Sequence, residues 1–434
     1  MDKLYLGVAR AIITPKVGAL LAGYSPDNVS TAVNDDLTAT VFYFKNSKTE
    51  ALLITATICA IIGRVTDELF SEVEKRYSIP RAACMLCSTH THSGPIMLSS
   101  FGWGDIDVEY KDSIFLPRII EAVGIAKENA RPVKMAVGVG ESYVGINRRE
   151  LNLENKIILG QNPWGPFDPR MTVLAFKDYD GNKVANIIHY GAHGTAAGKN
   201  TEISRDWHGV MIDTLEKECG ALTAFIQGAE GDTGPRLTNG RTTGGGDISY
   251  AMRLGAVGGQ DAVRVYNTVG GYHSPDLAIK RCKIKIPFGK RVSFEYAREE
   301  YEKFKDFDFN IRGRKARYYK AVMDSYENGY VEPECYEFEE TVLKIGDVTI
   351  VGFPYEIFSE ISLRIAEASE SAYTLCLTNV NDTLGYFATE SELCRGGYEI
   401  EMFRTSHLQP FVDNADFHLV RQTLDNIKNV EGEN

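Results

Sequence analysis

Two histidines one residue apart, His90 and His92, lie in the string Ser88-Thr-His-Thr-His-Ser-Gly-Pro95. The string follows an apolar, strand-like run at 82–86 and ends in a Gly-Pro pair that breaks a strand. Alternation along a strand places residues i and i+2 on one face, so the pattern predicts that both imidazoles point into one small volume. Neutral imidazole nitrogens are ligands of zinc and similar cations. Paired histidines at strand ends also occur as hydrogen-bonded structural residues, so the remaining donors of the chain decide between the two readings.

Further donors for a metal ion follow other predicted strands. His193 comes after the apolar run 183–190, and Glu356 comes after a strand-like run and a proline. Two neutral nitrogens and one anionic oxygen would leave a divalent cation electron-poor enough to acidify a bound water, which favours His90, His193 and Glu356 as ligands. Glu356 has a second interpretation, because a carboxylate at a helix start also complements the positive end of the helix dipole.

Several other polar residues are candidates for a supporting role or for a second ion site. Asp206 and His208 lie at a predicted helix start, where Asp206 is equally suited to cap the helix. Asp232 lies in a Gly-rich turn and is a turn former, a partner of a metal ligand or a ligand itself. Arg148 is predicted in a loop after the strand 134–140, where a guanidinium polarises a carbonyl or binds a carboxylate. The sequence contains no nucleophile elbow, phosphate-binding loop or dinucleotide-binding fingerprint.

The elements that position these residues are strand-like runs alternating with amphipathic helical stretches. This alternation predicts an α/β fold with a mixed β-sheet core flanked by helices. The predicted strands are 38–45, 51–61, 134–140, 171–179, 183–190, 221–227, 277–287, 336–345, 348–352 and 374–380. The predicted helices are 64–78, 108–130 with an interruption at Pro117, 208–219, 250–269, one opened by residues 354–356, and 418–429.

Two further segments have no simple strand or helix pattern. The charged, tyrosine-rich stretch 294–328 predicts a double helix that forms an ordinary outer layer, with a substrate lid as the alternative. The segment between 380 and 398 is predicted as an irregular, Gly-rich loop.

Composition limits the classes of partner. The 434 residues are 44% hydrophobic and 24% charged, in the globular range, and the net charge of −12 argues against nucleic acid or an anionic membrane as a main partner. No apolar run is long enough to span a bilayer, and the eight cysteines are scattered, as in reduced cytoplasmic proteins. The N-terminus has no signal-peptide pattern. We therefore expect a cytoplasmic protein with a small-molecule substrate and no stable membrane association.

The order of several short strings resembles the catalytic domain of the neutral ceramidase family. The most specific of them is Thr-His-Thr-His-Ser-Gly-Pro, and the resemblance spans nearly the whole chain. It implies one domain of the neutral ceramidase type over residues 1–434, without the family's C-terminal immunoglobulin-like domain, as in short bacterial relatives. The other strings are Gly7-Val-Ala-Arg-Ala-Ile-Ile-Thr-Pro15, Leu21-Ala-Gly-Tyr24, Asn147-Arg-Arg149, Ala192-His-Gly-Thr195, Ser204-Arg-Asp206 and Gly228-Ala-Glu-Gly-Asp232.

The resemblance also implies roles for individual residues. His90, His193, Glu356 and Tyr386 correspond to ligands of a Zn²⁺ ion. His92 and Arg148 correspond to groups near the substrate carbonyl, and Tyr398 to a catalytic hydroxyl. The sequence departs from the family pattern at Tyr355, which stands where the family has glycine before the ligand glutamate, and at Leu393, which replaces an internal tyrosine.

These implied roles predict a zinc-dependent hydrolase in which activated water attacks an amide, or a related ester or lactone. Because the chain shows neither export signal nor extra domain, we expect a small polar substrate, such as a sugar derivative, rather than ceramide. Two alternatives stay open: a metal-assisted lyase or isomerase acting on a polyhydroxylated substrate, and an inactive metal-binding relative. The sequence does not determine the oligomeric state, the physiological metal, or whether Asp206, His208 or Asp232 forms a second ion site.

Overall fold

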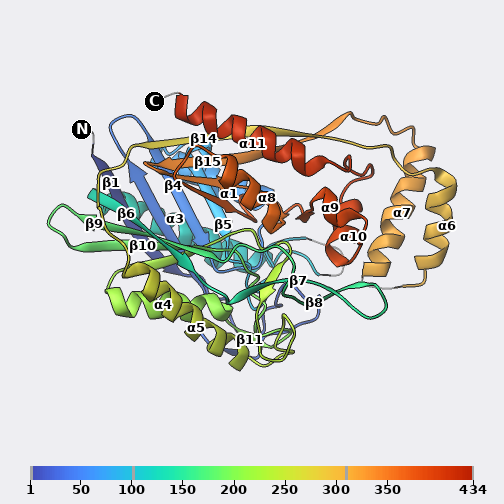
Figure 1. The fold of residues 1–434 in the computed structure, drawn as a ribbon, viewed down its shortest axis with the longest axis horizontal. Helices are drawn as coiled ribbons and strands as arrows, with labels where there is room; N and C mark the ends of the chain where they lie inside the picture. Colours follow the sequence, from blue (N-terminus) through green and yellow to red (C-terminus); the bar gives the residue numbers. More distant parts are fainter. Residues whose placement is uncertain (1–2, 100–102, 308–310, 433–434) are drawn as a thin grey trace.

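The computed structural model describes residues 3–99, 103–307 and 311–432 and has the expected mixed α/β architecture (Figure 1). Its centre is an eight-stranded sheet in the order β12-β10-β9-β6-β1-β3-β4-β5. Neighbouring strands are antiparallel except for the parallel pairs β4·β5 and β10·β12. The strands are β1 (Leu4–Ile12), β3 (Thr38–Lys45), β4 (Glu50–Ala56), β5 (Cys84–Ser88), β6 (Arg131–Glu141), β9 (Arg170–Asp178), β10 (Lys183–Tyr190) and β12 (Leu222–Gln227).

A second, four-stranded sheet packs on one face of the first, so the core has four layers. Along β3, Val41 and Tyr43 face helices while Phe42 and Phe44 face the second sheet, where Leu343 belongs to the same buried cluster. The strands of the second sheet are β14 (Leu277–Pro287), β15 (Cys335–Ile345), β16 (Val348–Gly352) and β18 (Tyr373–Leu377). The helices of the two outer layers are α1 (Gly63–Tyr77), α3 (Leu116–Glu128), α4 (Asp206–Cys219) and α5 (Ser249–Tyr266) on the large sheet, and α8 (Ser359–Ala368) and α11 (Ala415–Gly432) on the small one.

The eight-stranded sheet curls until its two edge strands, β5 and β12, contact each other. Next to this contact the hydroxyl of Thr55 in β4 donates to the carbonyl oxygen of Phe225 in β12 at 2.5 Å. The loops that follow β5 and β12 therefore reach the same region, although the two strands are at opposite ends of the strand order. The loop after β10, the strand next to β12, reaches this region as well, since Thr91 and Gly194 form a parallel bridge.

Shorter elements surround these loops. Two helices, α6 (Phe294–Phe304) and α7 (Ile311–Glu327), stand at one end of the molecule beside α9 (Glu390–Leu393) and α10 (Tyr398–Arg404) (Figure 1). The other elements are β2 (Ala32–Val33), β7 (Gly145–Leu151), β8 (Ile157–Asn162), β11 (Glu202–Ile203), β13 (Thr233–Pro235), β17 (Glu356–Ile357), β19 (Tyr386–Phe387), a 3₁₀ turn (Arg81–Ala83), α2 (Val108–Tyr110) and a π-helical turn (Lys111–Phe115).

Several element boundaries differ from the sequence-based expectation. The helix expected to open at 354–356 begins at Ser359, because Glu356 and Ile357 pair with Tyr386 and Phe387 in a two-stranded sheet. The same pairing and the helices α9 and α10 order the segment predicted as an irregular loop. The strand predicted at 51–61 ends at Ala56. The apolar residues Ile58 and Ile61 extended the predicted strand, but they pack against the α1 layer and do not pair in a sheet.

The expected helix at 108–130 is interrupted, as predicted, next to Pro117. Proline has no N–H to donate, and its ring clashes with the carbonyl four residues before it, here that of Ser113. The chain accommodates this with the π-helical turn ahead of α3, in which Leu116 N–H donates to Lys111 O. Within the described parts of the chain, no helix combines the length and the apolar character needed to cross a membrane.

The fully buried carboxyl of Glu340 links β15 to α11 and predicts a pH dependence of stability. It accepts hydrogen bonds from Thr423 Oγ1 (2.8 Å) and Asn426 Nδ2 (2.6 Å), and burial raises its pKa from 4.5 to about 7 against the lowering effect of these bonds. Between these two pH values the folded chain keeps a proton that the unfolded chain has lost. We expect the contribution of Glu340 to the free energy of unfolding to be fully present below pH 4.5. It should fall by roughly 1.4 kcal/mol per pH unit as the pH rises to 7.

Urea unfolding of Glu340→Gln at pH 5 and pH 7.5 tests this. The amide keeps both hydrogen bonds without ionising, so the variant should gain stability over the wild type at the higher pH and should show a flatter profile. The matched control is Glu218→Gln, at an exposed site on α4. An unchanged pH profile in Glu340→Gln would contradict the assignment.

Candidate metal centre

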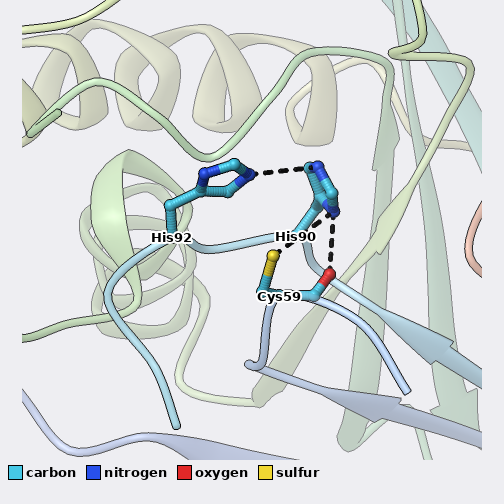
Figure 2. Close-up of side chains that lie close together, drawn as sticks. All are labelled: Cys59, His90 and His92. Atoms are coloured by element: carbon cyan, nitrogen blue, oxygen red, sulfur yellow. Dashed lines mark hydrogen bonds between the residues drawn. The ribbon is translucent and has the colours of Figure 1, made fainter. Parts of the chain in front are cut away.

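The imidazoles of His90 and His92 lie side by side. They do not come together by alternation along a strand, as the sequence pattern predicted. β5 ends at Ser88, and His90 has a left-handed backbone with φ of +62°. The loop is held by the His90 N–H, which donates to Ile58 O, and by the His92 N–H, which donates to Gly194 O. Figure 2 shows the resulting arrangement, in which the two Nε2 atoms are 3.2 Å apart.

Two glycines of the short sequence strings let backbone approach these imidazoles. Gly23 has φ of +102°, and a β-carbon there would lie 2.2 Å from His92 Nδ1. A β-carbon at Gly194 would lie 2.6 Å from the carbonyl oxygen of His90. The glycine in each string is therefore required for steric reasons, because a larger residue would collide with the site.

The ring orientations of His90 and His193 are set by backbone carbonyls. His90 Nδ1 lies 2.8 Å from Cys59 O, and His193 Nδ1 lies 3.1 Å from Thr233 O. Since a carbonyl only accepts, each Nδ1 carries the proton of the neutral imidazole, and each Nε2 presents a lone pair. This tautomer leaves Nε2 of each ring able to bind a metal ion.

Both lone pairs face the carboxylate of Glu356. Its Oε2 lies 3.2 Å from His193 Nε2 and 3.6 Å from His90 Nε2, and all three side chains are buried. Donors bound to one tetrahedral ion at about 2.0–2.2 Å are roughly 3.3–3.6 Å apart, which matches these separations. Glu356 Oε2 and His193 Nε2 are also buried without a hydrogen-bond partner. Buried polar atoms are rarely left unpaired, so the set fits a divalent cation.

The protonation states of these groups also suit a cation. Burial and then Arg148 lower the pKa of His193 to about 3, and burial lowers the pKa of His90 and His92 as well. Burial opposes ionisation of Glu356, but the positive charge that His90 and His193 carry when protonated, together with that of Arg148, outweighs it and holds the pKa of that carboxyl below its usual value. At neutral pH the group therefore contains neutral imidazoles and an ionised carboxylate.

Tyr386, Arg148 and Tyr398 lie next to this group. The pairing of β17 with β19 puts Tyr386 directly beside Glu356. Arg148 lies in β7 and not in the expected loop, and its Nη2 donates to the Tyr386 hydroxyl at 3.0 Å. The ring centres of Tyr386 and Tyr398 are 5.7 Å apart. The seven residues to which the family resemblance assigned roles thus lie around one centre.

A buried ion-pair network that the sequence analysis missed supports this side of the centre. Glu399 accepts from Arg148 Nε at 2.8 Å and from Arg149 Nη1 at 2.7 Å, and Glu399 is fully buried. Arg149 also donates to Glu392 at 2.9 Å and to the carbonyl oxygen of Gly396 at 2.6 Å. The network joins β7 to α9 and α10. The adjacent arginines and the Tyr398-Glu399 pair were visible in the sequence, but their pairing was not.

Glu230 and Asn379 form a second set that sequence reasoning missed. Glu230 accepts from Asn379 Nδ2 at 2.8 Å and from the Thr378 hydroxyl, and the Asn379 amide lies 3.3 Å from His90 Nδ1. Burial, followed by the charge of Glu356, raises the pKa of Glu230 well above its usual value. The Gly228-Ala-Glu-Gly-Asp232 string was the available signal for Glu230.

Among the described residues, the three candidates for a second ion site do not form one. They make hydrogen bonds and a ring contact with the surrounding structure. Asp206 accepts from the N–H groups of Ala196 and Ala197, both at 3.0 Å, and so holds the loop after His193. Asp232 accepts from the N–H and the hydroxyl of Ser359 at 2.8 and 2.6 Å, and so holds the start of α8. His208 stacks on Phe225 with ring centres 4.3 Å apart. Over the part of the chain that the structure describes, none of the three belongs to a metal-type cluster.

Cys59, His90 and His92 form a second cluster of donor atoms (Figure 2). The Cys59 sulfur lies 4.0 Å from His90 Nδ1, and that nitrogen carries the proton given to Cys59 O. Burial also raises the pKa of the Cys59 thiol well above its usual value. A thiol that keeps its proton and an imidazole nitrogen that carries one are poor ligands, so the cluster with Glu356 is the stronger candidate.

A cavity of about 280 Å³ opens onto the centre, and His90, Glu356 and Tyr386 line it. Two charged side chains, Arg314 of α7 and Asp382, also line it. The expectation that the 294–328 stretch is only an outer layer is therefore incomplete, since one of its side chains reaches this cavity. The apolar lining consists of Ala60, Ile62, Leu98, Trp103, Leu384 and Met402.

Comparison with known proteins identifies relatives. The family model for the N-terminal domain of neutral/alkaline non-lysosomal ceramidases matches residues 4–250. "Neutral ceramidase B" of Dictyostelium discoideum is 28% identical over 255 residues, which are 53% of this chain and 35% of that protein. "Neutral ceramidase" of Pseudomonas aeruginosa is 29% identical over 164 residues, 35% of this chain and 24% of that protein. The matched segments thus span about a third or less of these relatives.

The fold is similar to that of solved structures over nearly the entire chain. A crystal structure of neutral ceramidase from Pseudomonas aeruginosa aligns with a TM-score of 0.75 and 18% identity, covering 99% of this chain and 75% of that one. A structure described as ceramidase complexed with C2 aligns with the same TM-score and 16% identity, covering 98% and 75%.

The Arg148–Glu399–Arg149 network predicts a large loss of stability in Glu399→Gln. Removing the shared carboxylate leaves two buried guanidinium groups, and breaking a buried ion pair from one side costs about 3–5 kcal/mol. We expect urea unfolding to show a decrease of this size. Glu392→Gln is the matched control, because Glu392 is partly exposed and pairs with only one of the two arginines. This variant should lose about 1 kcal/mol of stability or less. Equal losses in the two variants would contradict the importance of the shared pair.

Proposed function

The chain belongs to the neutral/alkaline non-lysosomal ceramidase family, and we propose that it is a zinc-dependent hydrolase that cleaves an amide or a related ester or lactone bond. The observation that supports this most directly is the buried triplet His90, His193 and Glu356, in which Glu356 Oε2 and His193 Nε2 have no hydrogen-bond partner. We further propose that residues 1–434 act as one catalytic unit.

In this proposal His90, His193 and Glu356 hold the zinc ion, and Tyr386 completes the set. When bound there, the ion acts as a Lewis acid toward the substrate carbonyl and lowers the pKa of water. Asp206 and Asp232 are positioning residues, because they fix the loop after His193 and the segment after Glu356. Ligands held in this way need little rearrangement during the reaction, so the free-energy cost of rearrangement is small.

The residues facing the centre supply the remaining chemistry. We assign His92 to proton transfer at the leaving amine, because its imidazole is neutral and lies against His90. Tyr398 is assigned to hydrogen bonding of the developing charge. Arg148 contributes its positive charge, and because its Nε donates to Glu399 and its Nη2 to Tyr386, it orients the Tyr386 hydroxyl. The reaction consumes one water: its oxygen joins the acyl carbon, the C–N bond breaks, and the amine leaves with a proton.

The cavity favours a small substrate. Ligand pockets commonly enclose roughly 300–1,000 Å³, and the cavity of about 280 Å³ here lies just below that range. The reactive part of the substrate therefore has to be compact.

Zinc content and hydrolysis test the proposal together. We expect the purified chain to bind about one zinc ion and His193→Ala to lose both the ion and at least about 1,000-fold in turnover of short N-acyl amides, because only one imidazole would remain among the three ligands left. Metal analysis and amine release are the measurements. His273→Ala, at an exposed histidine away from the cavity, is the matched control and should keep both.

Incorporation of ¹⁸O from labelled water into the acid product distinguishes hydrolysis from lyase or isomerase chemistry. Turnover without incorporation would overturn the hydrolase proposal. Full activity in chain from which all zinc has been removed would overturn the role of the metal.

A further inference from the structure

The cavity beside the candidate ligands contains a cation that the proposed reaction does not use. Arg314 of α7 lines this cavity together with His90, Glu356 and Tyr386. Its Nε atom is buried and has no hydrogen-bond partner. The groups that favour its charged form are the hydroxyls of Tyr398 and Tyr386, and no described carboxylate is among them.

Apart from Glu356 at the candidate metal centre, the other charged groups around the cavity already have polar partners. Arg148 pairs with Glu399, and Lys315, the neighbour of Arg314 on α7, pairs with Glu401 at 2.6 Å. Asp382 is the cavity's other charged lining group besides Glu356, and its Oδ1 accepts from the N–H groups of Gly63 and Thr383, both at 2.8 Å. Asp382 thus stabilises the start of α1, and among the described residues no ion pair joins it to Arg314.

A partly buried guanidinium without a counterion is energetically unfavourable, and the burial of Arg314 lowers its pKa. A carboxylate on a ligand would remove this cost, because guanidinium and carboxylate form two parallel charge-assisted hydrogen bonds. The remaining lining, with Leu98, Trp103 and Met402, suits an apolar part of the same molecule.

Building on the proposed hydrolase function, we propose that the substrate is an amide that carries a carboxylate, and that Arg314 binds this carboxylate while the scissile carbonyl lies at His90, His193 and Glu356. An N-acyl amino acid has this chemistry. Its hydrolysis takes up one water, breaks the C–N bond and releases a carboxylic acid and the free amino acid. Arg314 is thus assigned as a specificity-determining residue supplied by the helical pair α6–α7.

The test compares two amides with the zinc-loaded protein. N-hexanoylglycine and N-hexanoylethanolamine share the scissile bond, but only the first carries a carboxylate. We expect kcat/KM to favour N-hexanoylglycine by about tenfold or more, and Arg314→Met to reduce this preference by roughly 10- to 100-fold, the value of a charge-assisted hydrogen bond. Methionine keeps the apolar stem of the side chain. Arg317→Met removes an exposed cation of the same helix outside the cavity and should preserve the preference.

A binding measurement makes the result independent of turnover. The ketone isostere of N-hexanoylglycine, in which a methylene replaces the scissile N–H, cannot be hydrolysed, and calorimetry gives its Kd. Weaker binding to Arg314→Met than to the wild type, by about tenfold or more, supports the assignment. Equal binding, or the same substrate preference in both proteins, overturns it. If the wild type hydrolyses neither amide, the hydrolase proposal fails for these substrates, and the isostere still decides the role of Arg314.

Discussion

The approach of one carboxylate oxygen to two imidazole nitrogens is the constraint around which this structure is organised. Glu356 Oε2 lies within 3.6 Å of both Nε2 atoms, and all three groups are buried. A buried carboxylate stays ionised only where neighbouring groups compensate for the loss of water. The carbonyls of Cys59 and Thr233 add a second condition, since they fix the proton of each imidazole on Nδ1. Together these contacts hold the two imidazoles and the carboxylate in the protonation states in which they can bind a metal ion.

Three separate parts of the chain have to meet for this arrangement, and the curled sheet brings them together. His90 follows an edge strand, His193 follows the strand next to the opposite edge, and Glu356 follows the second sheet. Contact between β5 and β12 closes the distance between the first two. The bonds from Asp232 to Ser359 then hold the segment with Glu356 against the loop after β12. The polar residues of the short strings are therefore divided between those that face the centre and those that fix its loops.

The side of the centre formed by β7, β19 and α10 depends on a different balance of charges. Glu399 satisfies two arginines at once, and this leaves the positive charge of Arg148 close to Glu356 and Tyr386 without leaving the guanidinium unpaired. Arg314 differs from both arginines because no described carboxylate pairs with it. One cation near the centre is thus neutralised within the protein, and the other faces the cavity.

The sequence by itself determined the α/β class, most of the core elements and the strings that contain the residues of the centre. These features are local, since strand alternation, helix periodicity and proline breaks act over a few residues. The sequence also supported the family resemblance, which the comparisons established. Only the tertiary structure decided how His90 and His92 come together, because the left-handed turn at His90 depends on contacts with Ile58 and Gly194. The same holds for the strand position of Arg148, the structural contacts of Asp206 and Asp232, and the reach of Arg314 into the cavity. Each of these depends on partners far away in sequence, and local pattern carries no information about such partners.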